Sequence, residues 1–123
     1  MKIAVISDIH SNLDAFMAVL DDISKLSIDD TVSLGDNIGY GAQPEEIIEN
    51  LKHYSITSVL GNHELALLDS DYLKTFGPFA RKALKINKSP FIAAVLSISF
   101  KTGKVWVFIV QLICTSSDNI YSI

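Results

Sequence analysis

Cysteine is almost absent from this sequence, and basic side chains are few. Cys114 is the single cysteine in 123 residues, so no disulfide can form within the chain, which points to a reducing compartment. Ten lysines and arginines stand against fourteen aspartates and glutamates, for a net charge of −4. Binding a nucleic-acid duplex requires clustered basic side chains that neutralise phosphates, and no such cluster occurs here. We therefore expect no nucleic-acid duplex among the partners.

Long hydrophobic runs are missing as well. The two most apolar stretches, residues 91–100 and 105–114, are each too short to cross a bilayer, and a polar Lys-Thr-Gly-Lys segment separates them. An apolar segment follows Met1 almost at once, so we expect no signal peptide. These features predict a cytoplasmic protein with no membrane contact.

The length and composition suit one globular domain. A chain of 123 residues, 49% of them apolar, has enough material for a single hydrophobic core. No internal repeat or low-complexity linker divides it. We therefore expect a single domain over residues 1–123.

Three apolar segments of strand length each end in polar side chains that suit a metal site. These side chains are Asp8, His10, Asp36, Asn62 and His63. In an extended segment, residues two apart point to the same side, which would bring the first two together. The carboxyl ends of parallel strands meet at one edge of a sheet, where sites are commonly built. One such pair could be a helix cap or a solvated loop, but three such segments favour a metal site.

Helical patterns alternate with the strand-like segments. Expected strands cover residues 3–6, 31–34 and 58–60, and we interpret the first as a buried strand. Expected helices begin near Ser11, at Pro44 and at Glu64, and a further helix over residues 72–86 is interrupted or begins at Gly77-Pro78. This alternation predicts an α/β fold with a parallel sheet core flanked by helices. Two further strands, over residues 95–100 and 105–112, would form a hairpin.

The motifs Asp8-x-His10, Gly35-Asp36-Asn37 and Gly61-Asn62-His63-Glu64 together resemble those of the calcineurin-like metallophosphoesterases. The segment 38–44, Ile-Gly-Tyr-Gly-Ala-Gln-Pro, is similar to a bacterial subgroup that includes symmetrical diadenosine tetraphosphatases and small phosphodiesterases. The resemblance extends from residue 1 to about residue 84. It implies the N-terminal part of a four-layer α-β-β-α sandwich, incomplete at its C-terminal side.

The resemblance also implies a function and roles for individual residues. It implies hydrolysis of phosphate mono- or diesters by a hydroxide activated between two divalent ions, with a small phosphate ester or nucleotide as substrate. Asp8 and His10 would hold one ion, Asn62 the other, and Asp36 would bridge them. His63 would be the catalytic residue that protonates or stabilises the leaving oxygen. The expected ion is Mn²⁺, with Fe, Ni, Zn or Mg as alternatives.

The sequence departs from the family pattern in two places. Such enzymes usually add histidines from later segments, but no histidine follows His63, and a segment ending in Gln111 stands where the first would be expected. Gly39 and Tyr40 replace an Asp and an Arg of the phosphoprotein phosphatases, which disfavours that activity. We therefore expect weakened hydrolysis, or alternatively a catalytically inactive metal- or nucleotide-binding domain. The apolar segment from Pro90 onward predicts self-association.

Overall fold

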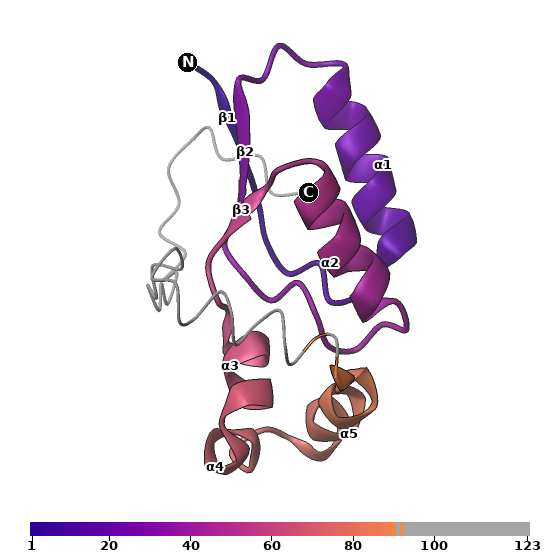
Figure 1. The fold of residues 1–123 in the computed structure, drawn as a ribbon, viewed down its shortest axis with the longest axis vertical. Helices are drawn as coiled ribbons and strands as arrows, with labels where there is room; N and C mark the ends of the chain where they lie inside the picture. The colour runs from indigo at the N-terminus through magenta and orange to yellow at the C-terminus, as the bar shows by residue number, and fades with distance from the viewer. Residues whose placement is uncertain (91, 93–123) are drawn as a thin grey trace.

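The computed structural model describes residues 1–90 and residue 92 (Figure 1). Strands and helices alternate through the first half of the chain, and short helices follow. In chain order the elements are β1 (Ile3–Ile6), α1 (Leu13–Ser24), β2 (Asp30–Ser33), α2 (Pro44–His53), β3 (Thr57–Ser58), α3 (Asn62–Leu68), α4 (Ser70–Leu73) and α5 (Pro78–Asn87).

The strands form one parallel sheet in the order β1-β2-β3. Ile3 lies opposite Asp30 in the β1–β2 pair, and Val32 lies opposite Thr57 in the β2–β3 pair. A helix connects each strand to the next, so the sheet consists of two βαβ units, as the alternating pattern predicts. The third strand is shorter than expected, although the Val59 N–H still donates to the Ser33 carbonyl at 3.0 Å.

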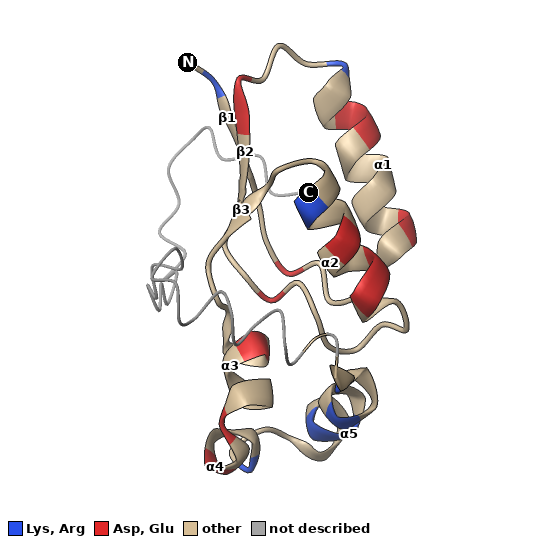
Figure 2. Cartoon of the chain, in the orientation of Figure 1, with Lys and Arg blue, Asp and Glu red and all other residues tan. Residues whose placement is uncertain are grey.

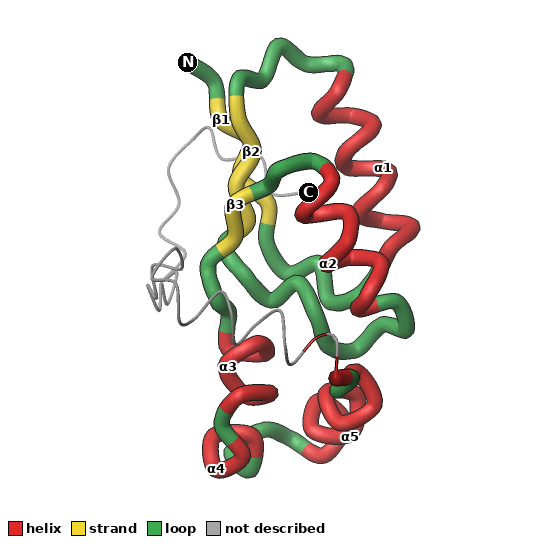
Figure 3. The backbone as a smooth tube through the Cα atoms, in the orientation of Figure 1, coloured by secondary structure: helices red, strands yellow, loops and turns green. Residues whose placement is uncertain are grey.

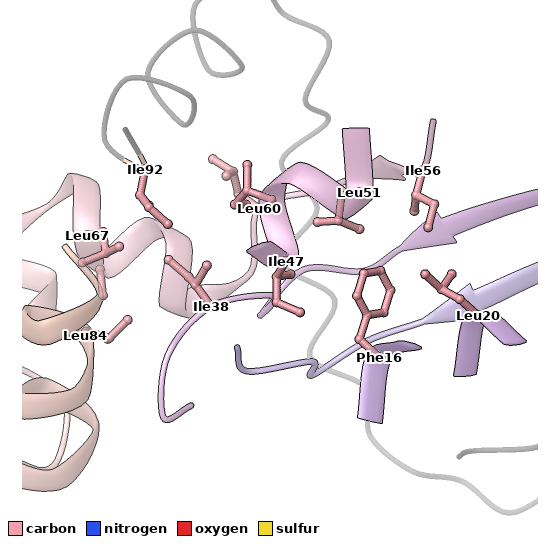
Figure 4. Packing of buried hydrophobic residues seen from close by; sticks show 12 residues of the cluster. Phe16, Leu20, Ile38, Ile47, Leu51, Ile56, Leu60, Leu67, Leu84 and Ile92 are labelled. Carbon is pink, nitrogen blue, oxygen red and sulfur yellow. The ribbon is translucent and has the colours of Figure 1, made fainter. Parts of the chain in front are cut away.

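Helices α1 and α2 cover one face of the sheet (Figure 1). Phe16 and Leu20 of α1 pack with Ile47 and Leu51 of α2 in a buried cluster, which Figure 4 shows at close range. These residues recur at helical spacing, and their burial removes apolar surface from water. The helix pattern in the sequence therefore identified this part of the core.

The exposure of β1 on the face away from α1 and α2 differs from the expectation. The apolar run predicted a buried strand, but Ile3 is 45% exposed and Val5 is 56% exposed, whereas Ala4 and Ile6 are half-buried. Successive side chains of a strand point to opposite faces, and among the described residues α1 and α2 cover only one of them. The expectation of a buried strand is therefore wrong for the face of β1 that carries Ile3 and Val5.

Helices α3, α4 and α5 form a group beyond the ends at which the strands finish, as the tube in Figure 3 shows. Ile38, Leu84 and Ile92 are fully buried there and continue the core away from the sheet. The helical segment is interrupted between α4 and α5, and Pro78 begins α5, in agreement with the expected interruption. This group closes over the edge of the sheet where ligand-bearing loops were expected.

Several expectations fall on residues that the structure does not describe. These are the strands over residues 95–100 and 105–112, the hairpin between them and most of the segment expected to self-associate. Within the described part of the chain, no helix is both long and apolar enough to cross a membrane.

Candidate metal centre

The loop after β1 lies against the loop after β2 and extends the pairing of their strands. The backbone N–H groups of Asp8, His10 and Ser11 donate to the carbonyls of Gly35, Asp36 and Asn37, at 3.2, 2.9 and 2.8 Å. Figure 2 shows acidic residues in both loops, and basic residues on α5 and at several other places along the chain. This pairing brings together the segments that carry Asp8 and Asp36, which are 28 residues apart in the sequence.

The backbone of these loops differs from the expected extended form. Asp8, His10 and Asp36 have φ angles of 58°, 50° and 54°, in the left-handed region. Aspartate tolerates this region better than most residues because its side chain can bond locally. The convergence of Asp8 and His10 was therefore predicted correctly, but the reason was wrong. A left-handed turn brings them together, not the alternation of a strand.

Asp8, His10 and Asp36 form a compact set of ligand atoms. One atom from each lies within 4.8 Å of the others, and His10 Nε2 is 3.6 Å from Asp8 Oδ1. His10 Nδ1 lies 3.2 Å from the carbonyl oxygen of Ile38, which can only accept, so the proton belongs on Nδ1 and Nε2 stays free. Two carboxylates with one imidazole suit a divalent ion such as Mn²⁺, Zn²⁺ or Fe²⁺. The residues present therefore fit one such ion.

Glu64 organises the loop that carries Asp36. Its buried carboxylate accepts backbone N–H bonds from Asp36 (2.9 Å), Asn37 (2.7 Å), Ile38 (3.2 Å) and Gly61 (2.8 Å). Burial raises the pKa of Glu64 and the nearby Asp36 charge raises it further, while these N–H bonds favour the charged form. The sequence showed Glu64 as part of a motif, yet suggested no role for it.

Two glycines permit the close approach of the loops after β2 and β3. A Cβ atom on Gly35 would lie 2.2 Å from the Gly61 nitrogen, and one on Gly61 would lie 2.2 Å from Asp36 Oδ1. Gly35 also has a φ of 93°, whereas Gly61, at −80°, needs no special conformation. Gly61 is therefore required by this close contact rather than by its own backbone conformation.

The start of α3 brings the third motif to Asp36. The His63 N–H donates to Asp36 Oδ1 at 2.8 Å, which leaves Oδ2 free of this bond. Asn62 is exposed at the first position of the same helix, next to this contact. The structure thus places the third motif beside the other two, and the role of Asn62 as a ligand remains a prediction.

His63 is only 4% exposed and lies among aromatic rings. Its ring centroid is 4.5 Å from that of His10, 5.0 Å from that of Tyr40 and 5.3 Å from that of Phe76. Burial lowers the pKa of His63, and the neighbouring His10 lowers it further, against an opposing effect of Asp36. Its Nδ1 is buried without a hydrogen bond among the described residues. A Cβ on Gly39 would lie 2.1 Å from this atom, so no side chain fits at residue 39 with His63 placed here.

Asn87, near the end of α5, ties two ligand loops together. Its Oδ1 accepts from the Ser11 hydroxyl at 3.0 Å and from the Gly39 N–H at 2.7 Å, and its Nδ2 donates to the Gly41 carbonyl at 3.1 Å. Sequence reasoning missed Asn87 entirely. No motif or periodicity marks it, because its contacts join segments that are far apart along the chain.

Comparisons with known proteins agree with this geometry. A family model described as calcineurin-like phosphoesterase matches residues 1–118. An uncharacterized protein of Methanocaldococcus jannaschii is 45% identical over 86 residues, which make up 70% of this chain and 35% of that protein. The crystal structure of a metallophosphoesterase from Sphaerobacter thermophilus matches with a TM-score of 0.60 and 37% identity, over 79% of this chain and 40% of that one.

The chain therefore spans well under half the length of these two relatives. Its parallel sheet with flanking helices agrees with the N-terminal part of the metallophosphoesterase fold. The subgroup suggested by residues 38–44 stays a prediction. On the family match and on the structural likeness, this chain belongs to the calcineurin-like phosphoesterase family.

Proposed function

We propose that the chain carries the metal-binding part of a hydrolase that cleaves phosphate mono- or diesters with the help of divalent ions. The observation that carries this proposal is the convergence of Asp8, His10 and Asp36 within 4.8 Å at the carboxyl edge of a parallel sheet. Membership of the calcineurin-like phosphoesterase family supports it. Divalent ions at such a site promote ionisation of water and offset the charge of the phosphoryl oxygens.

The residues of the chain would divide the work as follows. Asp8, His10 and Asp36 would hold the first ion, most readily Mn²⁺, and Asp36 with Asn62 would contribute to a second. Glu64 would keep the Asp36 loop in place through its four backbone contacts. His63, whose backbone is bonded to Asp36, would give a proton to the leaving oxygen or stabilise its charge.

The second ion has fewer ligands than the first. In the described part of the chain, Asp8, His10 and Asp36 are the one group of three His, Cys, Asp or Glu ligands found within metal-binding distance. The full sequence contains three histidines, His10, His53 and His63, and His53 is exposed at the end of α2. We therefore expect one firmly bound ion and slow hydrolysis. The alternative is a domain that binds metal or nucleotide without turnover.

Calorimetric titration with Mn²⁺ and hydrolysis of bis(p-nitrophenyl) phosphate would test this function. We expect about one tight Mn²⁺ per chain and turnover far below that of a full-length relative. Asp36→Asn keeps an oxygen for the His63 N–H but removes the charge, so Mn²⁺ affinity and any turnover should fall at least about tenfold. Asp71→Asn, on the exposed helix α4, is the matched control and should change neither.

Three outcomes separate the alternatives. Turnover that is lost in Asp36→Asn supports the hydrolase. Tight Mn²⁺ binding without any turnover favours the inactive binding domain. Absence of Mn²⁺ binding, or binding unaffected by Asp36→Asn, contradicts the assignment of the site.

A further inference from the structure

An open pocket of about 520 Å³ lies beside the candidate metal ligands. Its lining includes Asp8 and His10 from the loop after β1 and residues 40–43 from the loop after β2. Ile9, Ser11 and Asn12 also line it. Any phosphate ester bound at Asp8 and His10 would therefore place its organic part next to the turn that begins at Tyr40.

Tyr40 presents an aromatic surface at this pocket. Its side chain is 58% exposed, although it is large and apolar. One part of the ring packs on the imidazoles of His10 and His63, with centroid distances of 4.8 and 5.0 Å and interplanar angles of 75° and 55°. The edge contact with His10 and the tilted contact with His63 favour this orientation of the ring, while much of its surface stays open. The Tyr40 ring is thus an oriented aromatic surface that lines the pocket.

The backbone around Tyr40 is held in a conformation that tyrosine rarely adopts. Its φ angle is 50°, a left-handed value that costs energy for a residue with a bulky side chain. Asn87 bonds to Gly39 N and Gly41 O on either side, and the Gly41 N–H donates to the His10 carbonyl at 2.9 Å. Three hydrogen bonds therefore hold the turn, and they keep the Tyr40 ring against the two histidines.

We propose that Tyr40 is a specificity-determining residue that receives a planar aromatic group of the phosphate ester. The site would accordingly prefer aryl or nucleobase-bearing phosphate compounds over those with small alkyl groups. A flat ring can stack on the exposed part of Tyr40 with little loss of conformational freedom, because the Tyr40 ring is already held in its orientation before the ligand binds. This inference rests on the proposed function, since it needs the phosphate to bind at Asp8, His10 and Asp36.

Two phosphonates, which contain no P–O ester bond to hydrolyse, would test the proposal by binding alone. Phenylphosphonate and methylphosphonate carry the same anionic group and differ in the ring. We would titrate each by calorimetry into the full chain saturated with Mn²⁺, for the wild type and for Tyr40→Phe and Tyr40→Leu. Leucine keeps an apolar side chain of moderate size but removes the ring. Circular dichroism and the Mn²⁺ dissociation constant of each variant would show that fold and metal site are retained.

We expect the wild type and Tyr40→Phe to bind phenylphosphonate about tenfold more tightly than methylphosphonate, as one aromatic stacking contact allows. In Tyr40→Leu this ratio should fall to about twofold, with methylphosphonate affinity little changed. An equal affinity for both ligands in the wild type, or a ratio that Tyr40→Leu leaves intact, overturns the inference and leaves the metal-dependent function standing. Failure to bind Mn²⁺ at all overturns both, and the metal titration identifies that case.

Discussion

Glu64 is the residue on which the position of Asp36 depends most directly. Both of its oxygens accept two backbone N–H bonds each, three from residues 36–38 and one from Gly61. A carboxylate satisfies four donors because it carries only acceptor sites. A glutamine side chain would turn an N–H₂ group toward two of these donors, although its size is nearly the same. Charge, rather than shape, is therefore the requirement at this position.

Glu64→Gln should lower the free energy of unfolding by about 3 kcal/mol, because buried N–H donors would lose a charged acceptor. It should also weaken Mn²⁺ binding, since the Asp36 loop would move. Urea unfolding and calorimetry would measure the two effects. Glu49→Gln, at an exposed position of α2, should stay within about 0.5 kcal/mol of the wild type. An unchanged stability in Glu64→Gln would contradict the organising role.

His63 makes the stability of the metal-free chain depend on pH. Burial lowers its folded-state pKa below the ordinary value of 6.5, so the unfolded chain binds the proton more readily. The free energy of unfolding should be unaffected by this residue above about pH 6.5. It should then fall as the pH decreases through that value toward the folded-state pKa.

Urea unfolding between pH 7.5 and 5, in the presence of a chelator, would measure this decline. Because glutamine cannot take up the proton, His63→Gln should show a smaller decline in stability than the wild type. The stability curves of the wild type and of His63→Gln should therefore converge at low pH. Parallel curves over the whole range would show that His63 has no such effect.

At the scale of elements, the site depends on loops that approach one another without side chains between them. The loops after β1 and β2 share backbone hydrogen bonds, and the loops after β2 and β3 meet at Gly35 and Gly61. Helix α3 adds the His63 N–H bond to Asp36, and α5 adds Asn87. Three loops and two helices thus hold one small group of ligand atoms in place.

Gly61→Ala should disrupt this arrangement, because the new methyl group would lie 2.2 Å from both Asp36 N and Asp36 Oδ1. We expect a loss of stability of about 1–3 kcal/mol, as for overpacking, and a fall in Mn²⁺ affinity of about tenfold or more. Gly77→Ala is the matched control. Gly77 has a φ of −60° and no neighbour within 4 Å of the added atom, so the change should stay within about 1 kcal/mol.

Thermal unfolding and calorimetry of the two alanine variants would decide the matter. Equal effects at residues 61 and 77 would argue against a close approach at Gly61, because both substitutions add the same methyl group. A large effect at residue 77 alone would locate the sensitive contact in α5 instead.

At the scale of the whole molecule, the chain exposes apolar groups that a compact fold would be expected to cover. Ile3 and Val5 lie exposed on the face of β1 away from α1 and α2. The sequence 105–110, Val-Trp-Val-Phe-Ile-Val, is the most apolar stretch and lies beyond the described residues. Exposed apolar strands favour pairing with another chain.

We therefore propose that the chain forms a dimer or larger species through the region from Pro90 onward. Because the driving force is apolar, association should not depend on metal. Sedimentation velocity with and without chelator should show the same association state in both. A clean monomer at high micromolar concentration, with Trp106 shielded from a quencher of its fluorescence, would rule this out.

The local pattern of the sequence predicted most of the described elements and the convergence of the three candidate ligands. Apolar runs and helical spacing predicted the parallel α/β arrangement, and Asp8, His10 and Asp36 were expected together at strand ends. Such inferences succeed because the periods of strands and helices, and the meeting of parallel strand ends at one edge, follow from backbone geometry. The family motifs pointed to the same residues.

Only the tertiary structure decided the left-handed loops, the exposed face of β1, and the contacts of Glu64, Tyr40 and Asn87. The contacts of Glu64 with the Asp36 loop join residues 26 to 28 positions apart, and the bond from Ser11 to Asn87 spans 76 positions. No sequence period extends over such separations. These contacts depend on how closely the loops approach one another. The packing of helices α3 and α5 beyond the edge of the sheet determines that approach.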